Sequence, residues 1–181
     1  MNRKKKIALG VGLTIIVLYM LRTKLAKSLT NSSFGALSDK LFNLIGGLEN
    51  FNPVAFWDYK QWSIGYGSGY NWDEGRPVQK GDVIDKATAK QWLLNEAQSN
   101  FNEVKSLVQV PISDNQLLAL SSFAYNEGNG ALAGSTLLKL LNSGADINIV
   151  ANEFDKWVYA GGVVSPGLKN RRNAEKQLFL S

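Results

Sequence analysis

Two carboxylates and a hydroxyl lie close together in one short stretch of this chain. Glu49 precedes Asp58 by nine residues, and Ser63 follows five residues later. Mostly apolar side chains surround the acids: Leu48, Phe51, Val54, Phe56, Trp57 and Trp62. Because burial disfavours the charged form of an acid, one carboxyl of such a pair can hold a proton while the other stays ionised. Cleavage of a glycosidic bond requires a pair of this kind.

The two acids also fit structural roles, with Glu49 at the end of a helix and Asp58 in a hairpin. Taken without the rest of the chain, they indicate structural roles more strongly than catalysis. The composition narrows the chemistry further, because the chain contains no His and no Cys. Ser-His-Asp triads, His-ligated metals, thiolate chemistry and disulfides are therefore excluded. Catalysis must rest on carboxylates, hydroxyls, Lys, Arg or Tyr, and we expect neither a cofactor nor a metal.

The positive charge of the chain belongs to its first segment. The formal net charge is +5 over 181 residues, but residues 1–27 hold seven cations and no acid. The remainder has 13 basic and 15 acidic residues. Since that part is nearly neutral, we expect no nucleic-acid partner.

Residues 7–21 form an uncharged apolar run with cations on both sides. As a helix the run would span about 22 Å, short of a hydrocarbon core of roughly 30 Å, although flanking cations can snorkel. We expect a basic tail at 1–6, a transmembrane signal anchor at 7–21, and a linker or helical stalk at 22–37. The charge bias places the following domain outside the cytoplasm. A cleaved signal peptide is the alternative.

The remaining pattern predicts an α+β domain over 38–181. Apolar spacing predicts a helix from Leu37 that ends near Glu49, and residues 54–72 predict hairpin strands with Asp58 near the first turn. Asp85 is expected to cap a helix to about residue 108, and a capping box over 113–116 to open the next. Further helices are expected at 135–141, 147–157 and 168–179. The tryptophans at 72 and 92 are assigned to packing, and Trp157 to the core.

Several different short motifs follow one another along the chain. They are E-x8-D followed by S-I-G-Y-G at 63–67, V-P-I-S-D-N-Q at 110–116, S-F-A-Y-N-E-G at 122–128, S-T-L-L at 135–138, L-N-S-G at 141–144, F-x-x-W at 154–157 with G-G at 161–162, and G-L-x-x-R-R-x-x-E at 167–175. In this order and spacing the chain resembles the phage-type lysozymes, glycoside hydrolase family 24. The resemblance covers about 41–180.

The resemblance implies a lysozyme-like fold, with a cleft between a small β-hairpin lobe and a mainly helical lobe. It implies that Glu49 is the general acid and that Asp58 and Ser63 position a water, with inversion at the sugar carbon. Arg171 would belong to the binding site and orient Glu49. Asn126 would hydrogen-bond sugar. Tyr66 would line the cleft, although hairpin packing explains it equally well.

Two positions depart from the family pattern: Ser63 stands where Thr is usual, and Ser68 where His is frequent. The resemblance implies hydrolysis of the β-1,4 bond between N-acetylmuramic acid and N-acetylglucosamine in peptidoglycan, for lysis of the host by a phage. The expected partners are peptidoglycan and, through the anchor, the host inner membrane, with a monomeric soluble domain on its periplasmic side. The alternatives are a lytic transglycosylase and a lysozyme of a virion membrane used at entry.

Overall fold

The computed structural model describes residues 34–58 and 60–181, of which 37–181 belong to one compact unit. The predicted tail and signal anchor, and most of the predicted linker, lie outside the described residues. In the part that is described, no helix combines the length and the apolar character needed to cross a membrane.

A helix covers residues 34–48 and leads into the candidate site. Residues 34–37 of the predicted linker are helical and share the apolar stripe of this helix, and the compact unit begins at residue 37. Leu41 and Ile45 are fully buried on that stripe. The Glu49 amide donates to the Ile45 carbonyl at 3.0 Å, so Glu49 stands at the helix end, as predicted.

The β lobe begins with the antiparallel hairpin of β1 (Asn52–Asp58) and β2 (Gln61–Gly65). Asp58 is the last residue of β1 and pairs with Gln61 across the turn, which confirms its predicted place. β2 ends in a tight turn, in which the Ile64 amide donates to the Ser68 carbonyl at 2.9 Å and Gly65 has a φ of 65°. A second small hairpin follows, formed by β3 (Tyr70–Asn71) and β4 (Arg76–Pro77).

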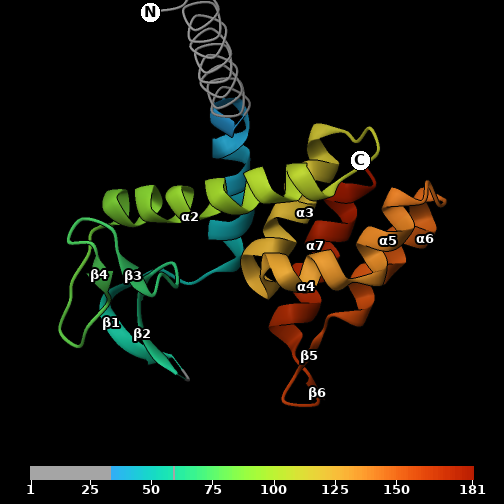
Figure 1. Ribbon diagram of the computed structural model, residues 1–181. Helices are drawn as coiled ribbons and strands as arrows, with labels where there is room; N and C mark the ends of the chain where they lie inside the picture. Colours follow the sequence, from blue (N-terminus) through green and yellow to red (C-terminus); the bar gives the residue numbers. More distant parts are fainter. Residues whose placement is uncertain (1–33, 59) are drawn as a thin grey trace, which may run out of the picture. The chain divides into compact units, whose positions relative to one another are not determined.

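Helix α2 (Lys86–Leu107) runs from the β lobe to the helical lobe (Figure 1). Asp85 is its N-cap, as predicted, and its carboxylate accepts from the amides of Ala87 and Thr88. The buried positions follow helical periodicity: Ala89, Trp92, Leu93, Ala97, Phe101 and Val104. One helix therefore supports residues of both lobes.

The helical lobe is built around α3 (Asp114–Glu127), which is buried without interruption from Leu117 to Ala124. The predicted capping box is present, with Ser113 and Gln116 as its two members. The elements that follow are α4 (Asn129–Gly134), α5 (Thr136–Asn142), α6 (Ile147–Asn152), the 3-10 helix η1 (Glu153–Lys156), the hairpin of β5 (Tyr159–Ala160) and β6 (Val163–Val164), and α7 (Pro166–Phe179). Helices α2 and α7 pack on α3. Trp157 packs edge-on against Phe123 at 5.1 Å but is only half-buried, so it borders the core in which it was expected.

Candidate active site

A pocket of about 620 Å³ brings together residues of both lobes. It is lined by Glu49, Asp58, Gln61, Tyr66, Gly67, Gly69, Trp72, Glu96, Ser99, Asn100, Tyr125 and Asn126. Four of the residues predicted from the sequence are in this set: Glu49, Asp58, Tyr66 and Asn126. Among the residues that the structure describes, the lining includes three carboxylates and no Lys or Arg.

Glu49 is held by an arginine from the other end of the chain. The Nη1 group of Arg171 donates to Glu49 Oε1 at 2.6 Å, and the side chain of Arg171 is only 6% exposed, against 29% for Glu49. Because the arginine is buried in α7, it fixes the direction of the carboxyl group from the protein side. Arg171 itself does not line the pocket.

The next residue of α7, Arg172, does the same for Asn126. Its Nη2 group donates to Asn126 Oδ1 at 2.7 Å, and this leaves the amide nitrogen of Asn126 as the donor available to the pocket. Arg172 is fully buried, lies over the ring of Phe123 at 4.7 Å and forms an ion pair with Glu175 at 3.0 Å. The orientation of Asn126 therefore rests on buried charges.

Glu175 is also fully buried, and Ser122 Oγ donates to its Oε1 at 2.7 Å. Burial raises the pKa of the Glu175 carboxyl to about 7, although Arg172, Ser122 and Arg171 act to lower it. Burial also lowers the pKa of Arg172. For both partners the loss of hydration outweighs their mutual attraction.

Ser63 lies outside the pocket wall. Ser63 is fully buried on β2. Gln61 does line the pocket, and its Nε2 group lies 3.5 Å from the Ser63 hydroxyl. Gln61 and Ser63 share a face of the strand because side chains alternate along it. Gln61, which the sequence prediction overlooked, is therefore a lining residue that contacts the Ser63 hydroxyl.

Tyr66 joins the pocket to the aromatic packing of the β lobe. It is 8% exposed and lies 5.5 Å from both Phe42 and Phe51, measured between ring centroids. Both roles considered for it from the sequence are therefore compatible with its position.

Glu96 is the most connected lining residue that the sequence did not single out. Its Oε1 accepts from Ser68 Oγ and from Trp72 Nε1, the latter at 3.1 Å, and its Oε2 accepts from Tyr125 Oη at 3.2 Å. Burial raises the pKa of Tyr125, and the nearby Glu96 and Glu49 raise it further. The tyrosine therefore remains a hydrogen-bond donor. Its place in the motif at 122–128 was the one sequence signal for it.

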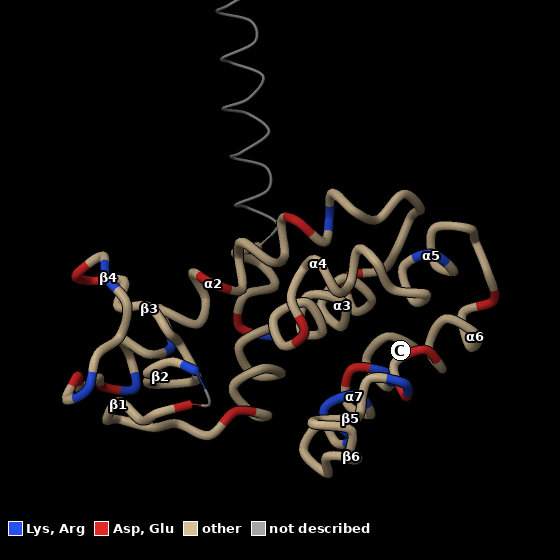
Figure 2. The backbone as a smooth tube through the Cα atoms, turned by 60° about the horizontal axis from the view of Figure 1, so that its bottom comes forward, with Lys and Arg blue, Asp and Glu red and all other residues tan. Residues whose placement is uncertain are grey.

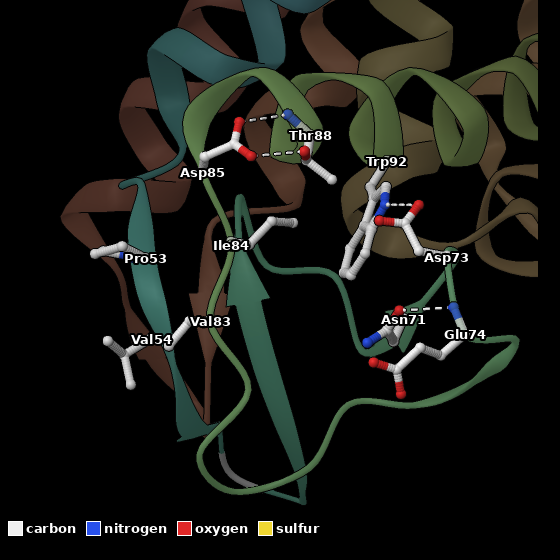
Figure 3. A pocket seen from close by; sticks show the side chains of 10 residues that line it. All are labelled: Pro53, Val54, Asn71, Asp73, Glu74, Val83, Ile84, Asp85, Thr88 and Trp92. Carbon is white, nitrogen blue, oxygen red and sulfur yellow. Dashed lines mark hydrogen bonds between the residues drawn. The ribbon is translucent and has the colours of Figure 1, made fainter.

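A second pocket, of about 510 Å³, lies on the β lobe and the start of α2 (Figure 3). Its acids already have structural partners: Asp85 accepts from Thr88 at the start of α2, and Asp73 accepts from Trp92 Nε1 at 3.2 Å. None of the residues predicted to form the site lines it. Over the described chain, acidic and basic residues are interspersed (Figure 2), so the acidic lining of the first pocket is a local feature.

Comparisons with known proteins group this chain with phage lysozymes and endolysins. The family described as Phage lysozyme matches residues 46–175. The endolysin of Bacillus phage B103 is 38% identical over 148 residues, which make up 80% of this chain and 54% of that protein, so the chain spans about half its length. The SAR-endolysin of Enterobacteria phage P21 is 28% identical and matches 80% of this chain and 87% of that protein.

A solved structure shares the fold. The endolysin from Escherichia coli O157:H7 phage FAHEc1 superposes with a TM-score of 0.71 at 32% identity, covering 78% of this chain and 91% of that one. The lysozyme-like α+β fold predicted for the two lobes is thereby confirmed.

Proposed function

Because this chain belongs to the phage lysozyme family, we propose that it is a peptidoglycan hydrolase that cleaves the β-1,4 bond between N-acetylmuramic acid and N-acetylglucosamine. The observation that carries the proposal is the pairing of Glu49 with Asp58 in one pocket, with Glu49 held in place by Arg171. The acidic lining suits a carbohydrate chain and disfavours the phosphate backbone of a nucleic acid.

In the proposed reaction, Glu49 gives its proton to the bridging oxygen as the bond from that oxygen to the anomeric carbon breaks. Asp58 accepts a proton from a water molecule, whose oxygen attacks the anomeric carbon from the opposite face of the ring. The products are two shorter glycans with inverted configuration at the new reducing end. In this reaction Gln61, which lines the pocket and contacts the Ser63 hydroxyl, would help to orient the water.

The test measures new reducing ends on purified peptidoglycan with Glu49→Gln and Asp58→Asn. Glu74→Gln is the matched control, because Glu74 also pairs with an arginine, Arg76, but lies outside the pocket. We expect the first two variants to lose at least about 100-fold in kcat, as removal of a positioned acid or base does. Full activity of Glu49→Gln would refute the assignment of the acid.

Mass spectrometry of the same digests separates hydrolysis from transglycosylation. A lytic transglycosylase uses the substrate's own hydroxyl and leaves 1,6-anhydro ends, whereas attack by water leaves reducing ends. We expect reducing ends, because Asp58 provides a second carboxylate in the pocket. Anhydro ends throughout the digest would contradict the hydrolase.

We further propose that the domain acts from the host inner membrane during phage release. The support is the apolar run at 7–21, flanked by cations, and the similarity to a protein named SAR-endolysin. Fractionation of infected cells should find the protein in the inner membrane before lysis. Its presence only in purified virions would instead support a lysozyme used at entry.

A further inference from the structure

Trp72 occupies a position that packing does not explain. It lies directly after β3, lines the pocket and is 42% exposed. The sequence assigned this tryptophan to packing, and the structure corrects that assignment. A large aromatic surface left open to a pocket is available to a ligand.

The open indole is held in one orientation. Its Nε1 group donates to Glu96 Oε1 at 3.1 Å, and the ring of Tyr70 lies edge-to-face with it at 5.2 Å between centroids. Glu96 is itself fixed by donors from Ser68 and Tyr125. Because all three donors point at one carboxylate, Glu96 is engaged as an acceptor and serves to position the indole.

The backbone on both sides of Trp72 is anchored as well. On one side, Asn71 is buried and its Oδ1 accepts from the Glu74 amide at 3.0 Å; on the other, Asp73 accepts from Trp92 Nε1 (Figure 3). A surface fixed in this way loses little conformational entropy when a ligand binds to it.

We propose that Trp72 is a stacking platform for an N-acetylated hexosamine ring of the glycan, and that Glu96 is the residue that positions it. The C–H groups on one face of a pyranose ring carry partial positive charge and fit the negative face of an indole. Ser99 and Asn100 of α2 line the same pocket and offer polar groups to the sugar substituents. The proposal deepens the proposed function and rests on it.

Since the stacking is present in the bound ground state as well as in the transition state, it acts on affinity. For the full-length enzyme on peptide-free glycan strands, Trp72→Ala should raise KM about 10-fold and leave kcat within about twofold, with Trp72→Phe between the two. Tyr159→Ala is the control, because Tyr159 is also an exposed aromatic residue, at 60%, and lies outside the pocket. It should match the wild type. An unchanged KM for Trp72→Ala, or a loss confined to kcat, would overturn the proposal.

Glu96→Ala tests the positioning role. As a single variant, Glu96→Ala should raise KM. In the double variant with Trp72→Ala it should add little, because both changes remove the same ordered platform. Additive effects would reject the link between the two residues. Thermal unfolding of each variant separates these effects from loss of fold.

Tryptophan fluorescence tests glycan binding by Trp72 without depending on catalysis. In the Glu49→Gln background, peptide-free glycan strands should change the tryptophan fluorescence, and Trp72→Phe should abolish that change. If Glu49→Gln remains active, the proposed acid is wrong whatever Trp72 does. If Glu49→Gln is inactive and the Trp72 variants still bind like the parent, the platform alone is wrong.

Discussion

Arg171, Arg172 and Glu175 form a buried charged cluster on α7. Replacing Glu175 by Gln tests whether burial or ion pairing dominates the contribution of this cluster to the free energy of unfolding. Glu175 is fully buried, and the charged groups that face it are Arg171 and Arg172 on α7 and Glu127 on α3. Burial raises its pKa from 4.5 to about 7. The folded protein therefore holds a proton on Glu175 more tightly than the unfolded chain does.

The sign of the effect follows from proton linkage. Between pH 4.5 and about 7 the folded state binds more protons than the unfolded state, so the free energy of unfolding falls as the pH rises. The contribution is fully present below pH 4.5 and is lost as the pH passes through about 7. One pH unit of difference in pKa is worth about 1.4 kcal/mol, so the loss amounts to roughly 3 kcal/mol.

Glutamine resembles the protonated acid in shape and can still accept from Ser122. We therefore expect Glu175→Gln to match the wild type near pH 4.5 and to be more stable by roughly 3 kcal/mol at pH 8. The assay is urea unfolding of the full-length chain in mild detergent, followed by tryptophan fluorescence across this pH range. Using the difference between the two proteins cancels the titration of the groups that do not interact with Glu175. A variant that is less stable than the wild type at pH 8 would refute the reasoning, because the ion pair with Arg172 would then outweigh burial.

Three further predictions concern the supports of the site. Arg171→Met should lower kcat at least about 10-fold with little change in KM, measured on peptidoglycan, because Glu49 loses the donor that orients it; an unchanged kcat would exclude that role. Gly65→Ala should destabilise the fold by about 1–3 kcal/mol in thermal unfolding, since its φ is positive and a Cβ would lie 3.0 Å from Ala89 Cβ; an unshifted Tm would contradict this. The hydrogen bonds from Arg76 lower the pKa of Asp82 to about 2, so its stabilisation is present above pH 3.8 and is lost as the pH falls through about 2. Asp82→Asn should remove this loss of stability at low pH. If the free energy of unfolding of both proteins fell in parallel as the pH was lowered, the prediction would be wrong.

Local features of the fold were predictable because short stretches of sequence determine them. The cap at Asp85 and the box at Ser113 and Gln116 depend on residues two to three positions apart. The place of Asp58 before the hairpin turn depends only on the strand pattern around it.

The site itself was predictable only as far as family motifs reach. Glu49 and Arg171 are 122 positions apart, so their contact follows from the resemblance and from no local pattern. The Glu96 cluster belongs to no motif as a whole: Ser68, Trp72 and Tyr125 come from the β lobe and α3 and meet on α2 only in the folded chain. The exposure of Trp72 is likewise a tertiary property. An aromatic residue in a glycine-rich hairpin region is interpreted from sequence as a packing residue.

The adjacent arginines of α7 explain why this fold retains costly buried charges. Arg171 holds Glu49, and Arg172 holds Asn126, while Glu175 balances the buried charge of Arg172. Burial shifts the pKa values of both Arg172 and Glu175 against their charged forms, so the cluster costs stability at neutral pH. What the cluster supplies is a fixed direction for two side chains of the pocket. If that is its role, Glu175→Gln should gain stability at pH 8 and yet lose affinity for glycan, because Arg172 would then hold Asn126 less firmly; a gain in both would separate the cluster from the site.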